Sequence, residues 1–299
     1  MNKIWMIIAA SLLLVGLIAF ITVMTLNNWD FSILVTDRIV TVTHNIDDDF
    51  EDISIFADTA DITFKLSDDD KCKVVCNELE KERHWVAVED NTLVIEHRVQ
   101  KKWYDYIGIG IGTDEITVYL PSKEYGNLIV DEHTGDVAVP NGLSFENVGI
   151  SVTTGDITVE NISAKELELA TTTGDIKILG AKCKGNVNVT VNTGDSELND
   201  VKCANLSSKG TTGDICMTKV VAENYISVKR NTGNVTFDSC DAADINVKTS
   251  TGDVKGSFLS EKIFITETNT GKVNLPYSKS GGICEISTDT GDISFEING

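Results

Sequence analysis

Proline and basic residues are scarce in this sequence. Its 299 residues include 3 prolines, and 25 Lys or Arg residues stand against 46 Asp or Glu residues, which gives a formal net charge of −21. An acidic surface of this kind repels nucleic acid and anionic lipid headgroups, so we expect no nucleic-acid partner. The few prolines and the many Val, Ile and Thr residues favour β-strands, and an apolar content of 41% excludes a disordered chain.

Motifs of enzymes and metal sites are also scarce. The four histidines, at positions 44, 84, 97 and 133, show no ligand spacing, and Cys72 and Cys76 do not form the CxxC half-site of a zinc motif. No helical pattern follows the glycine string at residues 108–112, so a phosphate-binding loop is not expected. Arg230 is the only arginine after residue 130. We therefore predict no catalytic residue, no cofactor and no enzyme activity. A glycan-processing enzyme stays the second alternative, because β-helices host such enzymes where carboxylates cluster in a cleft.

An uncharged apolar stretch runs from Ile4 to Leu26, with Lys3 as the only charge before it. Its 23 residues would form a helix of about 34 Å, longer than a hydrocarbon core of roughly 30 Å. The alternative, a cleaved signal peptide, usually has an apolar core of about 7–15 residues followed by small residues. We therefore expect residues 1–30 to be a retained single-pass anchor in the cell membrane. Lys3 favours a cytoplasmic N-terminus and an extracytoplasmic body.

From residue 131 onward the chain repeats a Thr-Gly turn that is usually followed by Asp. The turn glycines are 19 or 20 residues apart, at positions 135, 155, 174, 194, 213, 233, 252, 271 and 291. A fixed period of this length indicates a coiled repeat, in which each unit buries its apolar side by stacking on its neighbours. We predict an all-β chain with a parallel β-helix of nine regular rungs over residues 131–299. Residues 31–130 are expected to be an irregular β region that caps or begins it.

The repeat also predicts which side chains face the core. Counting the turn glycine as zero, positions +2 and +4 are mostly apolar, as in Ile157 and Val159, whereas position +3 is mostly polar, as in Thr158. Strand alternation then places +2 and +4 inside and +3 outside. A degenerate copy of the turn at residues 58–62 suggests that the irregular region starts the same coil.

The turn residues have a mechanical interpretation. Glycine supplies a corner with positive φ, and the following Asp caps nearby backbone N–H groups. The alternative is a ladder of cation-binding carboxylates about 4.8 Å apart, formed by Asp136, Asp156, Asp175, Asp195 and Asp214. Calcium takes about six to eight oxygens, more than one carboxylate per rung supplies, so we predict no metal site.

Most cysteines fall on inward positions of the repeat. Cys183 and Cys203 occupy the same position on adjacent rungs, either as buried small residues or as a disulfide. Cys240 and Cys284 also occupy inward positions, whereas Cys216 lies at the outward +3 position. We therefore expect Cys216 to react with a hydrophilic thiol reagent and the other two to resist it.

Residues 101–106, Lys-Lys-Trp-Tyr-Asp-Tyr, form a local basic and aromatic stretch in an otherwise acidic chain. The stretch is consistent with a plain hairpin tip. It is also consistent with a patch that stacks on sugars or lies at a membrane interface.

Several strands and the serial turns together resemble a known family. The segments are Asp-Ile-Thr-Phe at 61–64, Leu-Val-Ile-Glu at 93–96, Ile-Thr-Val-Tyr-Leu-Pro at 116–121 and the nine Thr-Gly turns. Over residues 50–299 the chain resembles the bacterial putative-adhesin domain-of-unknown-function family, whose members are envelope-associated β-solenoids. This resemblance implies a right-handed β-helix at the cell surface, and it brings no catalytic residues with it.

We therefore interpret the chain as a membrane-anchored, extracytoplasmic interaction protein of a bacterial envelope that binds a surface, with a glycan or protein partner. An envelope-stress accessory protein is the first alternative.

The last expectation concerns the end of the rod. The final strand before Gly299 would present unpaired N–H and C=O groups, so we expect weak self-association or strand addition through the C-terminal rung.

Overall fold

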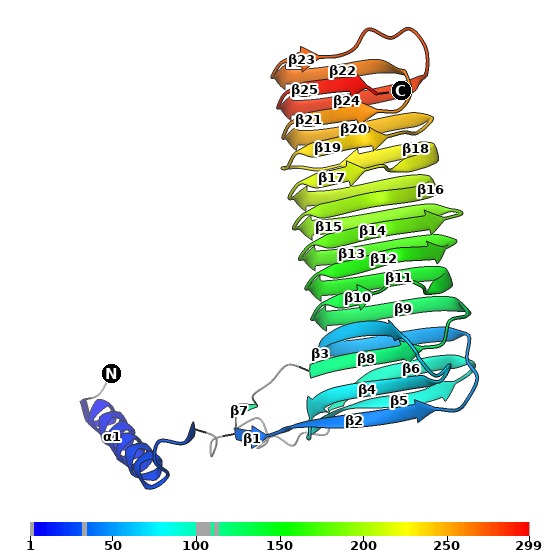
Figure 1. Ribbon diagram of the computed structural model, residues 1–299. Helices are drawn as coiled ribbons and strands as arrows, with labels where there is room; N and C mark the ends of the chain where they lie inside the picture. The colour runs from blue at the N-terminus through cyan, green and yellow to red at the C-terminus, as the bar shows by residue number, and fades with distance from the viewer. Residues whose placement is uncertain (1–2, 32–34, 100–108, 111–113, 299) are drawn as a thin grey trace.

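A computed structural model describes residues 3–31, 35–99, 109–110 and 114–298, which form one helix and a long β-solenoid (Figure 1). The helix and strands are α1 (Lys3–Leu26), β1 (Val35–Asp37), β2 (Ile39–Ile46), β3 (Asp52–Leu66), β4 (Cys72–Leu79), β5 (Glu82–Glu89), β6 (Thr92–Val99), β7 (Ile109–Gly110), β8 (Asp114–Leu120), β9 (Glu124–Thr134), β10 (Val137–Val139), β11 (Ser144–Thr154), β12 (Ile157–Ala164), β13 (Glu166–Thr173), β14 (Ile176–Cys183), β15 (Asn186–Thr193), β16 (Ser196–Thr212), β17 (Ile215–Thr218), β18 (Val221–Lys229), β19 (Val235–Cys240), β20 (Asp244–Thr251), β21 (Val254–Phe258), β22 (Lys262–Thr270), β23 (Val273–Asn274), β24 (Gly282–Thr290) and β25 (Ile293–Ile297).

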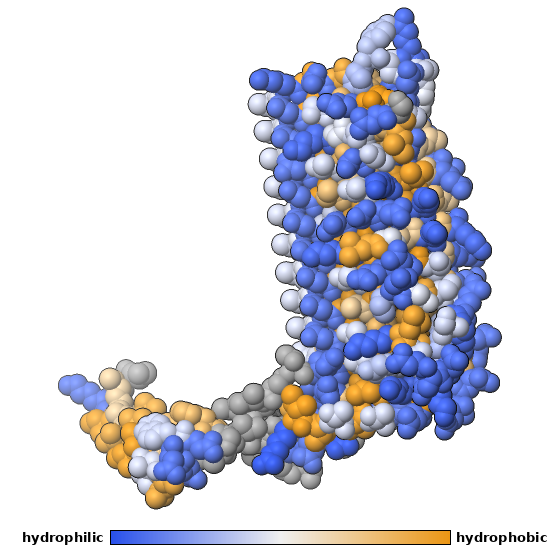
Figure 2. Space-filling view, viewed as in Figure 1, coloured by the Kyte–Doolittle hydropathy of each residue, from blue (hydrophilic) through white to orange (hydrophobic). Residues whose placement is uncertain are grey.

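Helix α1 has the length and composition of a membrane span. It contains 24 residues, and an 18-residue stretch of it has a mean hydropathy of 2.8. Figure 2 shows hydrophobic residues gathered on this helix, whereas the visible face of the rod is largely hydrophilic. The hydroxyls of Ser11, Thr22 and Thr25 donate to helix carbonyls three or four residues earlier, at 2.7–2.9 Å. Because these polar groups are satisfied within the helix, α1 suits a solvent without water.

The solenoid is built from parallel strands, as the repeat predicted. Each turn contains a first strand, a Thr-Gly corner and a second strand, and each strand pairs with its equivalents in neighbouring turns. Thus β11 pairs in parallel with β9 and β13, and β12 pairs with β10 and β14. The prediction of an all-β chain with a β-solenoid and one N-terminal apolar helix is confirmed.

The inward positions are also confirmed for most turns. Ile157 and Val159 at +2 and +4 are fully buried, and they stack in register on Ile176 and Ile178 of the next turn. The exception is the turn at Gly271, where Val273 at +2 is 47% exposed although it is in register with buried Ile293.

The base of the rod mixes parallel and antiparallel pairing. Strand β3 is the first turn of the coil, because its two halves pair in parallel with β9 and β10. Its corner is the degenerate turn at residues 58–62, where Thr59 is in register with Thr134 and Ile62 with Val137. Beyond β3, strand β4 runs antiparallel to both β2 and β8, and β5 forms an antiparallel pair with β6.

The last two turns are stacked in the reverse of their order in the sequence. Strand β24 pairs with β20 on one side and β22 on the other, and β25 lies between β21 and β23. Figure 1 shows β24 and β25 inside the rod and β22 and β23 at its end. The prediction that the C-terminal rung is the open end of the rod is therefore wrong, because both of its strands are paired on both sides.

Side-chain polarity and two glycines account for the reversal. The inward side chains of β24 include Cys284 and Ile286, which are fully or almost fully buried, and their register partners on β22 are Phe264 and Thr266. The more apolar turn thus occupies the interior. Consecutive glycines at 281 and 282 let the chain enter between two turns, since an added Cβ would collide with the backbone of Glu261 and Ala243, respectively.

Arg230 is a charged residue that lies inside the coil. Arg230 is 2% exposed, and its guanidinium Nη2 donates to the Ser196 hydroxyl at 2.8 Å and to the Ser208 hydroxyl at 3.2 Å. An added Cβ at Gly210 would meet the guanidinium, so this glycine leaves room for it. Burial lowers the pKa of Arg230 to about 10.

Candidate binding groove

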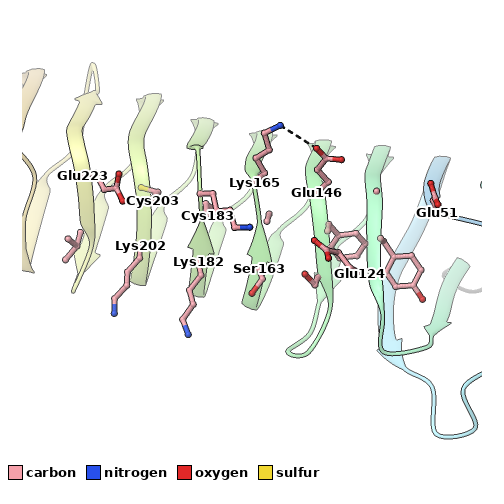
Figure 3. Close-up of a pocket in the computed structure, with 17 residues that line it drawn as sticks. Glu51, Glu124, Glu146, Ser163, Lys165, Lys182, Cys183, Lys202, Cys203 and Glu223 are labelled. Carbon is pink, nitrogen blue, oxygen red and sulfur yellow. Dashed lines mark hydrogen bonds and ion pairs between the residues drawn. The ribbon is translucent and has the colours of Figure 1, made fainter.

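A groove of about 840 Å³ runs along one corner of the solenoid, where each second strand gives way to the first strand of the next turn. Figure 3 shows the residues that line it on successive turns. They are Glu51, Glu124, Tyr125, Gly126, Ser144, Phe145, Glu146, Ser163, Ala164, Lys165, Lys182, Cys183, Lys184, Lys202, Cys203, Val221 and Glu223.

The groove exists because the side chains at this corner change size along the rod. Tyr125 and Phe145 fill the corner of the first two regular turns, with ring centroids 5.7 Å apart. The equivalent positions in the next three turns hold Ala164, Cys183 and Cys203, all of them buried and all much smaller. The small residues leave a hollow that the flanking side chains border.

Lysines dominate the middle of the groove. Lys182 and Lys202 are in register on neighbouring turns, and Lys165 and Lys184 lie on the other side of the buried column. All four side chains are exposed. Carboxylates lie at the two ends. Glu51, Glu124 and Glu146 line the end nearer the base, and Glu223 lines the other end.

One ion pair joins the basic and acidic parts. The Lys165 Nζ lies 3.5 Å from Glu146 Oε1, and both side chains are more than half exposed. An exposed pair of this kind contributes only about 0–1 kcal/mol, so a ligand can displace it at little cost. The lysines therefore form a basic patch on a protein whose net charge is −21.

The floor of the groove is chemically inert. Cys183 and Cys203 are adjacent, buried and unbridged. Burial raises the pKa of each thiol to about 12, so both stay protonated and weakly nucleophilic. The sequence left open whether these residues are buried or bridged, and the structure shows two buried free thiols.

The other cysteines of the repeats lie where alternation placed them. Cys216 is exposed, and Cys240 and Cys284 are fully buried. Burial raises the pKa of Cys240 to about 11 and that of Cys284 to about 12. The inward and outward positions of these residues are confirmed, whereas their labelling stays a prediction.

The aspartates of the Thr-Gly-Asp turns bond between turns rather than within one. Each accepts a hydrogen bond at Oδ1 from the backbone N–H of the next aspartate, at 2.7–2.8 Å, along the series Asp136, Asp156, Asp175, Asp195 and Asp214. Within the described residues, the set of three or more metal-binding side chains that lie together contains none of these aspartates. The cation ladder stays a hypothesis, and capping of the next turn is what the geometry shows.

The ladder of hydrogen bonds between turn aspartates continues at both ends, and an asparagine replaces aspartate at one step. It starts at Asp61, which accepts from the Asp136 N–H, and it passes through Asn234, whose Oδ1 accepts from the Asp253 N–H at 2.9 Å. Its last step is the Lys272 N–H donating to Asp292, in agreement with the reversed turns.

The glycines of the Thr-Gly corners stack in a column. Glycine is required there both by the positive φ of the corner and by the close packing of neighbouring turns. Gly174 has φ +141°, and an added Cβ would collide with the carbonyl oxygen of Gly155 in the preceding turn. The same collision recurs along the column. Any side chain here would force the turns apart.

Two sequence hypotheses fall largely outside the described residues. The basic and aromatic stretch at 101–106 lies outside them, and so does most of the glycine string at 108–112.

The groove lysines were missed at the sequence level. The available signal was the pair of Lys residues that flank Cys183, with Lys202 beside Cys203 on the next turn.

Comparison with known proteins places this fold in a family. A model of the Toastrack DUF4097 family matches residues 50–294. A crystal structure of a "putative adhesin" from Parabacteroides merdae is 12% identical with a TM-score of 0.54, and the alignment covers 88% of this chain and 98% of that one. A "putative adhesin" from Parabacteroides distasonis is 11% identical with a TM-score of 0.52, and the coverage is 86% and 96%.

At these identities the two structures show a shared fold and nothing more. No curated protein matches this sequence. The family resemblance stated from the turns and strands is confirmed by the match over residues 50–294. The chain belongs to the Toastrack DUF4097 family.

Proposed function

We propose that this protein is a noncatalytic, membrane-anchored binding protein whose solenoid lies outside the cytoplasm and holds an acidic glycan in the corner groove. The observation that carries the proposal is the patch of four exposed lysines along a groove of about 840 Å³ on an acidic rod. Lysines so placed attract carboxylates on a chain that lies along the groove.

Features of the groove favour a glycan over a peptide. The hydroxyls of Ser144 and Ser163 and the carboxylates of Glu124 and Glu146 line the same groove, so they provide partners for sugar hydroxyls along with the charge of the lysines. The rim carboxylates lie along the groove rather than in a facing pair, and the thiols of its floor are protonated, which supports binding without catalysis.

The proposed position of the protein rests on α1. Its 24 residues are sufficient to cross a membrane, and Lys3 favours a cytoplasmic N-terminus. We therefore propose that α1 is retained as a single-pass anchor and that the rod extends from the outer side of the cell membrane. The names of the structurally similar proteins agree with a role at the cell surface.

The experiment is a binding titration of the full-length protein in detergent with polygalacturonate oligomers, a carboxylate-bearing glycan. Dextran oligomers of equal length provide the neutral comparison, and polyglutamate provides the acidic peptide. We expect polygalacturonate to bind and dextran not to bind. Binding should weaken as salt is raised, because the contacts are exposed.

Two triple variants with the same change in charge locate the site. Lys182→Gln, Lys184→Gln and Lys202→Gln remove the groove lysines, and the control Lys209→Gln, Lys229→Gln and Lys248→Gln removes an exposed lysine column elsewhere on the rod. Exposed ion pairs contribute about 0.2–1 kcal/mol each, so the loss of three should make the groove variant bind roughly 3- to 150-fold more weakly. Equal loss in both variants, or tighter binding of polyglutamate, would refute the proposed site or ligand.

A further inference from the structure

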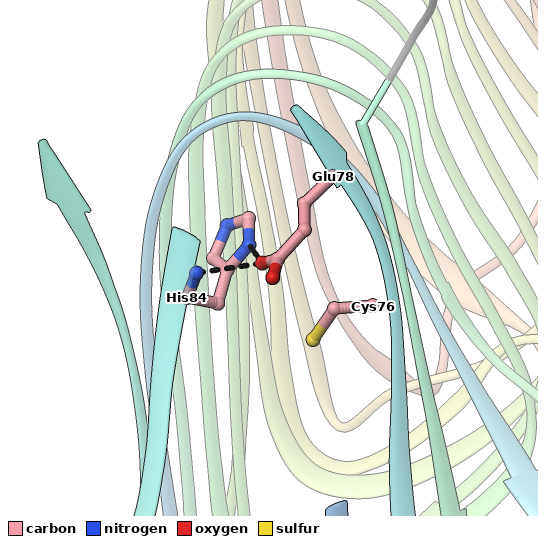
Figure 4. A group of neighbouring side chains, drawn as sticks. All are labelled: Cys76, Glu78 and His84. Atoms are coloured by element: carbon pink, nitrogen blue, oxygen red, sulfur yellow. Dashed lines mark hydrogen bonds and ion pairs between the residues drawn. The ribbon is translucent and has the colours of Figure 1, made fainter. Parts of the chain in front are cut away.

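Three metal-binding side chains lie together at the base of the rod, far from the groove lysines in sequence. They are Cys76 and Glu78 on β4 and His84 on β5, and one ligand atom from each lies within 4.8 Å of the others. Their side chains point toward one another in Figure 4. The three residues are 0%, 1% and 5% exposed, respectively.

The local fold explains why they meet. Cys76 and Glu78 are two residues apart on one strand, so both point to the buried face of β4. A short link leads into β5, where the His84 backbone N–H donates to Glu78 Oε2 at 2.7 Å and the ring Nδ1 lies 3.0 Å from the same oxygen. The sequence spacing alone did not reveal this set, because it depends on how β4 and β5 fold over each other.

Further ionisable groups surround the three side chains. The Nε2 atom of His44 is buried without a hydrogen-bond partner, and the His97 ring centroid lies 5.5 Å from that of His84. Asp114 is 8% exposed and lies within electrostatic reach of Glu78 and Glu82. Buried carboxylates close to one another favour a cation among them.

We propose that Cys76, Glu78 and His84 bind one zinc ion at the base of the solenoid. A thiolate sulfur, an imidazole nitrogen and a carboxylate oxygen are the three ligand types that zinc takes in proteins. Zinc–nitrogen and zinc–oxygen bonds of about 2.0–2.1 Å at a tetrahedral angle place two ligand atoms roughly 3.3 Å apart. The observed separation of 3.0 Å between His84 Nδ1 and Glu78 Oε2 requires only a small expansion.

Binding exchanges protons for the metal. The proton between His84 Nδ1 and Glu78 Oε2 goes to solvent, or to His84 Nε2 where the imidazole is neutral, so that Nδ1 binds zinc as part of a neutral ring. The Cys76 thiol releases its proton to solvent as the sulfur becomes a ligand. The ion then joins β4 to β5 by coordinate bonds. This stabilises the antiparallel base of the rod, and it is independent of what the groove binds.

The test uses untagged full-length protein in detergent, reduced and freed of metal with a chelator. Zinc is added and the bound metal is counted by elemental analysis after desalting. A parallel sample receives cobalt, whose charge-transfer absorption reports a thiolate ligand. We expect one zinc ion per chain, a thiolate–cobalt band and a higher midpoint of thermal unfolding with zinc.

Cys76→Ser should abolish the thiolate–cobalt band and weaken zinc binding by more than the roughly 10- to 100-fold typical of losing an outer partner of a metal site. Glu78→Gln should weaken zinc binding as well. The matched control is Cys72→Ser, which changes another buried cysteine on the same face of β4 and should leave binding unchanged. Absence of stoichiometric zinc in the unaltered protein, or retention of zinc and of the band in Cys76→Ser, would overturn the proposal.

Discussion

A single buried glutamate should make this protein less stable as the pH rises from acidic to neutral. Glu132 lies on an inward position of β9, in register with Ala57 and Val152, and is fully buried. Its Oε1 accepts hydrogen bonds from the backbone N–H groups of Ala60 and Thr134, at 3.3 and 3.1 Å, whereas Oε2 is buried without a partner.

Burial raises the pKa of Glu132 from its ordinary value of 4.5 to about 7, even though its backbone hydrogen bonds act in the opposite direction. Between these two values the folded chain keeps the proton that the unfolded chain releases, so folding becomes less favourable as the pH rises. The difference corresponds to about 3 kcal/mol, lost between about pH 4.5 and pH 7 and constant above.

Glu132→Gln removes this charge and keeps an oxygen for the two N–H groups. We expect the variant to match the unaltered protein near pH 4.5 and to be up to about 3 kcal/mol more stable at pH 8. Denaturant unfolding of the full-length protein, followed by far-ultraviolet circular dichroism between pH 4 and 8, measures both. Glu168→Gln, an exposed substitution on β13, is the control. Equal pH dependence in the Glu132 variant and the unaltered protein would refute the reasoning.

Three further outcomes follow from the coil. In the native protein, a hydrophilic maleimide should modify Cys216 at least several times faster than Cys240, and equal rates by mass spectrometry would contradict the assigned faces. Gly174→Ala should cost about 2–5 kcal/mol in denaturant unfolding, from strain at positive φ and a collision with the preceding turn, and a cost under about 1 kcal/mol would contradict the stacking. Self-association through the end of the rod should involve β22, so Ile265→Lys should reduce it in sedimentation experiments and Glu296→Lys in β25 should not; the opposite ranking would contradict the reversed turns.

The coil was predictable because its information is local and repeated. Each turn carries the same corner and the same inward pair, such as Ile157 and Val159, so one rule assigns the faces of most turns. The rule fails at Val273, which has the right residue type at the right position but lies at the end of the stack. Stacking order depends on which turn buries more apolar surface, and the repeat does not encode it. The glycine pair at 281–282 was the visible signal for the reversal.

The candidate sites were harder to predict for two different reasons. The groove depends on the relative sizes of corner side chains, from Phe145 to Ala164, and this comparison needs the register between turns. The cluster around His84 depends on how β4 and β5 fold over each other at the base of the rod, where no repeated pattern assigns the faces of the strands. Common zinc-ligand spacings such as CxxC do not include this set, although its three residues lie between positions 76 and 84.

The location of the bound glycan tests the central claim most directly. Hydrogen exchange of the full-length protein, measured by mass spectrometry with and without saturating polygalacturonate, reports which backbone segments the ligand protects. The groove predicts protection of segments that contain residues 163–165, 182–184 and 202–204, and unchanged exchange at the Thr-Gly corners on residues 172–174 and 192–194. Protection confined to the Thr-Gly corners, or no protection at saturation, would contradict the account.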